Sequence, residues 1–143
     1  MTRKDGFTLL EILIALTIIG ILSGVVGLSV SGYLRKAKLE AGRSQIKTFQ
    51  TALQMYKAAQ GLLPSTAQGL EALCVQPTIP PLPKDYPPEG YLESRTLPKD
   101  PWGNPYVYLV PGRRGEPFEI VSYGADGEEG GTGEAADISS GQQ

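Results

Sequence analysis

Histidine is absent from this chain of 143 residues, and cysteine occurs once, as Cys74. Without histidine, the sequence lacks the commonest general base and the commonest zinc ligand, and no Ser/His or Cys/His nucleophile can form. A single cysteine cannot form an internal disulfide, and with no histidine to activate it we expect Cys74 to be buried in the apolar segment 70–75. These absences exclude most hydrolase mechanisms, and no group of residues supports an enzyme.

A strong excess of charge of one sign is also absent, because 13 Lys and Arg residues are balanced by 15 Asp and Glu residues, for a formal net charge of -2. The basic residues between Arg35 and Lys57 are sparse and form no polybasic tract, so a nucleic-acid footprint is missing. The length is enough for one domain with one modest core. We expect a single domain that does not bind nucleic acid.

One long apolar run is present, at residues 7–30. As a helix rising about 1.5 Å per residue, this run spans roughly 33–36 Å, which matches a hydrocarbon core of about 30 Å. Arg3 and Lys4 precede the run, so the positive-inside tendency places the N-terminus in the cytoplasm and the rest of the chain on the far side of the membrane. We therefore predict a single transmembrane helix at 7–30 and an extracytoplasmic domain at 31–143.

An acidic residue, Glu11, lies inside this apolar run, where burial of its charge in lipid costs about 2.5–3.5 kcal/mol. Cleavage between Gly6 and Phe7 would create an amine at the same end of the helix, able to pair with the Glu11 carboxylate of a neighbouring copy. A secretory signal peptide is the alternative, but the run is longer than an ordinary apolar region of about 7–15 residues and lacks a clear small-residue cleavage site. Assembly of copies through this helix would neutralise both charges.

The sequence Lys-Asp-Gly-Phe-Thr-Leu-Leu-Glu at residues 4–11 resembles the processing site of type IV pilins and type II secretion pseudopilins. In that family a prepilin peptidase cuts after the glycine and methylates the new phenylalanine amine, and the glutamate guides the subunit into a helical filament. The resemblance implies a leader peptide at 1–6, cleavage and N-methylation at Gly6 and Phe7, and an assembly role for Glu11. It also implies a type IV pilin-like fold.

Helical periodicity continues beyond the apolar run. The apolar residues that share one helical face are Ile46, Phe49, Leu53 and Tyr56. Their spacing of three and four predicts that the helix continues to about Gln60. Ser65, with Gln68 three residues later, is typical of a capping box and predicts a short second helix ending near Val75.

The remaining elements are a proline-rich loop and a hairpin. Six prolines within residues 77–88 exclude a regular helix or a central strand there and predict an extended loop. Residues 106–110 and 118–122 alternate like strands, and the segment 111–116 between them predicts an antiparallel hairpin. Trp102 is expected to pack at a corner where the loop meets the sheet. We predict an α+β fold, in which a short helix and a small antiparallel sheet pack on the outer half of a long N-terminal helix.

The segment 123–137 is acidic and rich in glycine. It combines a flexible backbone with hard oxygen ligands, which suits the six to eight oxygens that calcium requires. The absence of histidine and of paired cysteines argues against zinc and softer metals. An EF-hand is excluded, because positions three and five counted from Asp126 are Glu128 and Gly130. A solvated, disordered acidic tail is the alternative to a calcium site.

Three further segments carry the resemblance over nearly the whole chain. Residues 56–57, 64–70 and 97–106 are similar to major pseudopilins of type II secretion, and adhesive pilins do not share them. The resemblance implies the major subunit of the pseudopilus, a helical homopolymer that drives export of folded proteins across the outer membrane. It implies an inner-membrane location with a periplasmic domain, and as partners the minor pseudopilins, the inner-membrane assembly platform and the prepilin peptidase.

Two other functions stay open at the level of sequence. A type IV pilus subunit would use the same N-terminal helix but normally carries a disulfide near its C-terminus, which the lone Cys74 cannot supply. A membrane-tethered calcium-binding module would need the acidic segment but no processing site at Gly6 and Phe7. Cleavage at that bond therefore separates the second alternative from a pilin.

The acidic segment also resembles the calcium loop of major pseudopilins. In that loop a backbone carbonyl before a Gly-Ala-Asp sequence, the aspartate itself and a later aspartate bind the ion. The resemblance implies that the carbonyl of Tyr123 and the carboxylates of Asp126 and Asp137 bind calcium here, with Glu134 as the intermediate acidic ligand.

Overall fold

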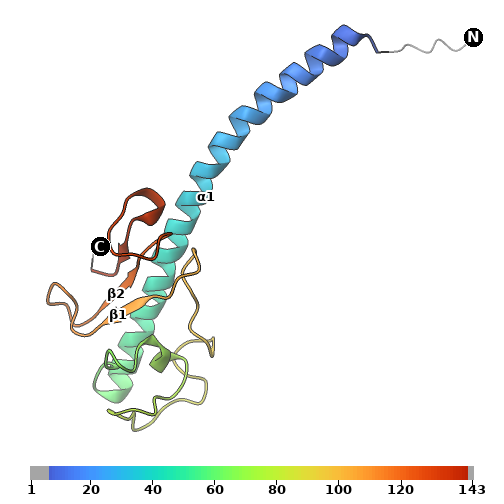
Figure 1. The fold of residues 1–143 in the computed structure, drawn as a ribbon. Helices are drawn as coiled ribbons and strands as arrows, with labels where there is room; N and C mark the ends of the chain where they lie inside the picture. The colour runs from blue at the N-terminus through green and yellow to red at the C-terminus, as the bar shows by residue number, and fades with distance from the viewer. Residues whose placement is uncertain (1–6, 142–143) are drawn as a thin grey trace, which may run out of the picture. The chain divides into compact units, whose positions relative to one another are not determined.

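The computed structural model describes residues 7–141, and for residues 25–30 it describes the backbone alone. The predicted leader, with Gly6, lies outside the described residues. Residues up to Ala37 and residues from Lys38 onward form two compact units. The elements, drawn in Figure 1, are α1 (Leu9–Gln60), the 3₁₀ helix η1 (Leu70–Leu73), β1 (Val107–Leu109), β2 (Glu119–Ser122), the 3₁₀ helix η2 (Gly133–Ala135) and β3 (Ile138–Ser139).

Local hydrogen bonds set both ends of α1. At its start, the Thr8 side-chain Oγ1 accepts from the backbone N–H of Glu11 at 3.2 Å, so Thr8 is the N-cap. Glu11 lies in the first turn, where its negative charge complements the helix dipole. At the other end, Gly61 adopts φ 79° and its N–H donates to the carbonyl of Lys57 at 2.8 Å, closing the helix. The predicted end at Gln60 is confirmed.

The first unit exposes apolar side chains along its helix. Those that are more than half exposed include Phe7, Leu9, Leu10, Leu13, Leu16, Ile19, Ile21 and Leu22. In the part of the chain that the structure describes, no helix is both long enough and apolar enough to cross a membrane. The transmembrane segment predicted at 7–30 includes the side chains of 25–30, which lie outside the described residues, and it stays a prediction.

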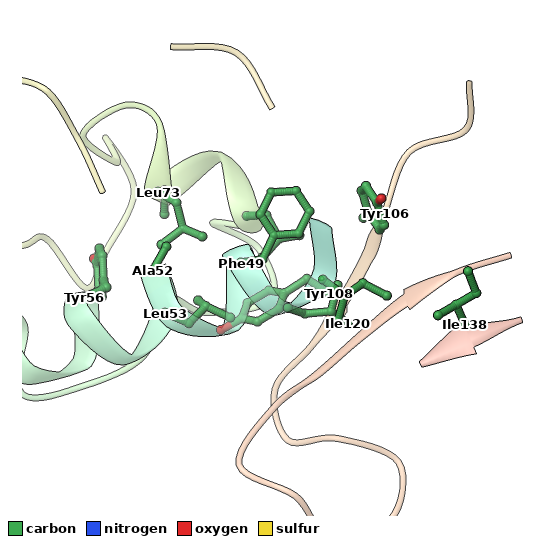
Figure 2. Close-up of a cluster of buried hydrophobic side chains, with 12 residues drawn as sticks. Phe49, Ala52, Leu53, Tyr56, Leu73, Tyr106, Tyr108, Ile120 and Ile138 are labelled. Carbon is green, nitrogen blue, oxygen red and sulfur yellow. The ribbon is translucent and has the colours of Figure 1, made fainter. Parts of the chain in front are cut away.

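The second unit is built around the apolar face predicted for the outer half of α1. Ile46, Phe49, Leu53 and Tyr56 are each at most 1% exposed, which confirms the predicted helical face. Figure 2 shows Phe49 and Leu53 on the helix close to side chains of the strands, and the rings of Phe49 and Tyr106 meet edge to face at 5.0 Å. The main core therefore lies between α1 and the sheet.

The sheet is antiparallel with strand order β1-β2-β3. The predicted hairpin is confirmed, with Val107 opposite Val121 in the register of β1 and β2. The third strand was not predicted, because its two residues are too short to show alternation. Since β3 pairs with the free edge of β2, the central strand is buried along its whole length.

The predicted capping box forms, but the helix after it is shorter than predicted. The N–H of Ser65 donates to Gln68 Oε1 at 2.9 Å, and the N–H of Gln68 donates to Ser65 Oγ at 3.2 Å. An α-helix cannot continue, because Gly69 adopts φ 65° and ψ −172°, and only the 3₁₀ turn η1 follows. Cys74 comes directly after it and is buried as predicted, and burial together with the charge of Glu71 raises the pKa of its thiol.

Two glutamine amides hold the proline-rich loop. Gln68 Nε2 donates to the carbonyls of Ile79 and Pro81, at 2.8 Å each. Gln60 donates to the carbonyl of Asp85 at 2.7 Å and accepts from the N–H of Lys84 at 2.9 Å. Neither helix nor strand forms at 77–88, which confirms the predicted loop. Side-chain amides replace the backbone bonds that proline cannot make.

Candidate functional site

The acidic, glycine-rich segment forms a loop that leaves the end of β2 and returns to β3. Its neck is closed where the N–H of Ala125 donates to the carbonyl of Glu134 at 2.9 Å. Gly124 adopts φ 64°, and a Cβ there would lie 2.7 Å from that same carbonyl oxygen. Only glycine fits this position, because any side chain would push the two sides of the neck apart.

Asp137 turns its carboxylate toward the loop. Its Oδ2 accepts from the N–H of Gly130 at 3.0 Å. Its Oδ1 is buried and has no hydrogen-bond partner among the described residues. A buried carboxylate oxygen without a partner costs about 1–3 kcal/mol or more, and a cation bound beside it would remove that cost. This oxygen is the feature of the loop that best fits a hard cation.

The other predicted ligands lie around the same loop with less contact. Asp126 is exposed and its Oδ1 accepts from the N–H of Glu128 at 3.3 Å, while Glu134 is exposed and Tyr123 is half-buried at the end of β2. Within residues 7–141, no three His, Cys, Asp or Glu side chains lie together as a metal site. The loop thus supplies carboxylate and carbonyl oxygens suited to calcium, without the predicted ligands being gathered into one cage.

The turn at residues 100–104 supports this loop through side-chain hydrogen bonds. Asp100 is 5% exposed, and its Oδ1 accepts from the N–H groups of Trp102 and Asn104 at 3.0 and 2.7 Å. Its Oδ2 accepts from the hydroxyl of Ser122, at the end of β2, at 2.6 Å. Asn104 Nδ2 then donates to the carbonyl of Gly124 at 2.7 Å. Sequence analysis missed this support, although an aspartate ahead of a Pro-Trp-Gly turn is a signal for such side-chain bonds.

An ion pair joins the buried Glu119 on β2 to the partly exposed Arg113 in the loop between β1 and β2. Glu119 is 4% exposed, and its Oε2 and Oε1 accept from Arg113 Nε and Nη2 at 3.0 and 3.1 Å. The hydroxyl of Ser139 on β3 donates to Glu119 Oε1 at 2.7 Å, and Arg113 also pairs with Glu129 in the acidic loop. Hydrogen bonds from Arg113 lower the pKa of Glu119 to about 2, against the opposing effect of burial.

The predicted processing and assembly residues lie at the start of the first unit. Phe7 is 77% exposed, and the side chain of Glu11, one turn further along, is also exposed. The start of the described chain therefore presents an apolar ring and an acid that are both exposed.

Comparison with known families decides what the chain is. The family described as type II secretion system (T2SS), protein G, matches residues 29–141. The chain belongs to this family of major pseudopilins. The prokaryotic N-terminal methylation motif matches residues 1–27, next to the protein G match. Both parts of the resemblance found in the sequence are thus confirmed.

Individual pseudopilins agree with this assignment. The chain is 48% identical over 136 residues to the type II secretion system core protein G of Pseudomonas aeruginosa, covering 95% of this chain and 94% of that one. It is 44% identical over 138 residues to the core protein G of Vibrio cholerae, covering 96% and 92%. The crystal structure of the major pseudopilin of enterohaemorrhagic Escherichia coli matches with a TM-score of 0.65 and 35% identity, over 77% of this chain and 91% of that one.

Membership in the pseudopilin family settles two questions. The chain is a structural pseudopilin of type II secretion, with a processing and methylation motif, and it is not an enzyme. The predicted pilin-like α+β fold, with its long N-terminal helix and small antiparallel sheet, is also confirmed.

Proposed function

We propose that this pseudopilin is drawn from the inner membrane into a helical homopolymer whose growth pushes folded proteins across the outer membrane. The family match over residues 29–141 is the observation that carries the proposal. Its partners are other copies of the chain, minor pseudopilins, an inner-membrane assembly platform and a prepilin peptidase. The role of the subunit is assembly, which uses a processed N-terminus and a rigid domain on a long helix.

The membrane anchor of the proposed subunit is the helix at 7–30, after removal of the leader at 1–6. Support comes from the apolar sequence of this run and from the methylation motif matched over residues 1–27. Arg3 and Lys4 orient the anchor with its N-terminus on the cytoplasmic side. The domain at 31–143 then lies in the periplasm, where the growing polymer needs it.

Charge pairing is the proposed basis of assembly. Once the leader is removed, the amine of Phe7 is a cation at the same end of the helix as the carboxylate of Glu11. Neither group meets a core within its own chain, since both residues are exposed. Two unpaired charges in lipid are costly, and pairing the amine of one copy with the carboxylate of its neighbour removes both costs.

Processing is testable by mass. We expect the chain purified from cells that contain the peptidase to begin at Phe7 with one methyl group on its amine, as measured by intact-mass and N-terminal peptide spectrometry. A Gly6→Ala variant changes the residue at the cut and should retain residues 1–6. A wild-type chain that keeps its leader in the same cells would contradict a pilin function and favour a tethered binding module.

Calcium is the proposed cofactor of the acidic loop. The ligands are the carbonyl of Tyr123 and the carboxylates of Asp126, Glu134 and Asp137. The partnerless buried Oδ1 of Asp137 supports this assignment, as do the hard oxygen groups around it. When bound, the ion neutralises the carboxylates that it draws together and ties the loop to β2 and β3, so its binding free energy becomes folding free energy of this end of the domain.

Thermal melting of the full chain in detergent tests the calcium proposal. At a free calcium concentration about a hundredfold above Kd, binding adds about 2.7 kcal/mol, which corresponds to a rise in Tm of roughly 10 °C. We expect Asp137→Ala and Asp126→Ala to abolish this rise. Glu128→Ala removes a nearby exposed charge that is not an assigned ligand and should keep the rise. A wild-type melt unchanged in saturating calcium would disprove the proposal.

A further inference from the structure

We infer that Asn104 is a positioning residue for the calcium loop, held by the buried Asp100 so that its amide fixes the backbone carbonyl of Gly124, two residues before Asp126. This inference rests on the proposed calcium function. It assigns to the Asp100–Asn104 turn a role beyond packing, because the turn contacts the loop at the two glycines that flank a predicted ligand.

The turn that carries Asn104 is fixed before it reaches the loop. Besides the side-chain bonds of Asp100, the N–H of Asp100 donates to the carbonyl of Asn104, and the N–H of Gly103 donates to the carbonyl of Asp100, both at 2.9 Å. The bond from Ser122 to Asp100 anchors the turn to the end of β2. A five-residue turn with this many internal bonds has little conformational freedom left to lose.

From this turn, the Asn104 side chain reaches the loop at two places. Its Nδ2 donates to the carbonyl of Gly124 at 2.7 Å. Gly127 adopts φ 69°, and a Cβ built there would lie 3.4 Å from the atoms of the Asn104 amide. Asp126 stands between these two glycines in the chain, so the hydrogen bond fixes the backbone on its N-terminal side and the Asn104 amide lies beside Gly127 on the other.

Such a brace affects binding because Asp126 is exposed and its carboxylate accepts from the N–H of Glu128 within the same loop. A ligand on a loose glycine-rich segment must be ordered when the ion binds, and that ordering weakens binding. The bond from Asn104 orders the backbone in advance. The Asn104 amide donor also fixes the direction of the Gly124 carbonyl, which comes one residue after the predicted carbonyl ligand Tyr123.

Calcium affinity of the full chain in detergent, measured by titration calorimetry, tests the role. A hydrogen bond of this kind contributes about 0.5–1.5 kcal/mol, so we expect Asn104→Ala to raise the calcium Kd roughly twofold to twelvefold. Asn104→Asp keeps the size but loses the donor. Its added negative charge favours the cation, so weaker binding by Asn104→Asp would isolate the effect of the hydrogen bond.

A matched control separates positioning from general stability. Gln68→Ala removes another amide that donates to backbone carbonyls, at the distant proline-rich loop. We expect it to lower the calcium-free Tm without changing Kd. An unchanged Kd in Asn104→Ala would overturn the positioning role alone. A wild-type chain that binds no calcium would overturn the calcium proposal and this inference with it.

Discussion

Replacing Glu11 by alanine is expected to abolish assembly of the filament while leaving the subunit folded. The change removes the carboxylate and leaves the Phe7 amine of each neighbouring copy unpaired in an apolar setting. Removing one member of a buried ion pair costs about 3–5 kcal/mol, which is more than about a hundredfold in the assembly equilibrium. The measurement is the amount of cross-linked polymer recovered from cells that express equal amounts of each variant.

Two controls make the Glu11 result specific. Thr17→Val alters another polar side chain of the same helix, whose hydroxyl donates to the carbonyl of Leu13 one turn back, and should assemble normally. The intact mass of the Glu11→Ala chain must show normal cleavage, so that failed processing is not mistaken for failed assembly. Filament in wild-type amounts from Glu11→Ala would show that charge pairing does not guide assembly.

Arg113→Ala is expected to destabilise the second unit strongly, because it breaks the ion pair with Glu119. It leaves the carboxylate of Glu119 buried with the hydroxyl of Ser139 as its remaining side-chain partner. Because Arg113 is itself partly exposed, we place the loss at about 3 kcal/mol, the low end for a broken buried pair. Urea unfolding of the full chain in detergent at pH 7 measures it. A loss below about 1 kcal/mol would show that water solvates the Glu119 carboxylate once the Arg113 side chain is removed.

The same pair makes stability depend on pH, with a sign that can be fixed. The pKa of Glu119 is about 2 in the folded chain against an ordinary value of 4.5, so the unfolded chain binds the proton first as pH falls. The stabilisation that the ionised Glu119 contributes to folding is complete above about pH 4.5 and is lost as pH falls toward 2. We expect Glu119→Gln to show a shallower loss of unfolding free energy over that interval than the wild type. Equal slopes would contradict the lowered pKa.

Local patterns predicted the parts of the fold whose signals are local. The end of α1 followed from the spacing of its apolar face, and the Ser65 and Gln68 capping box formed with both of its bonds. The second helix was overestimated because the left-handed backbone of Gly69 breaks it after one turn. A glycine in the sequence does not reveal which of its allowed conformations the fold will select.

Long-range pairing decided the features that the sequence did not reveal. Alternation in 118–122 predicts a strand with one solvated face. All four residues of β2 are nevertheless buried, because β3 pairs along the edge that would otherwise be open and the Arg113 side chain bonds to Glu119. Glu119 becomes a buried carboxylate for the same reason. Asn104 acts on a loop 20 residues away, and no spacing rule connects those positions.

The candidate site residues likewise divide into those that a local motif carries and those that depend on the path of a loop. Phe7 and Glu11 were assigned because a short contiguous motif carries them; the methylation motif matches that segment, and the roles of the two residues stay predictions. The calcium ligands were assigned from composition and resemblance, and they stay predictions, with Asp137 the one whose surroundings fit best. Ligand geometry depends on a loop of flexible glycines, whose path the sequence does not determine.

Export itself tests the central claim most directly. Proteins in the culture medium and in the periplasm would be compared between a strain lacking this chain and the same strain with the gene restored. The account predicts that exported proteins accumulate in the periplasm of the deletion strain and return to the medium on restoration. Normal export from the deletion strain, with loss of surface filaments instead, would contradict the account and make the chain a subunit of a surface pilus.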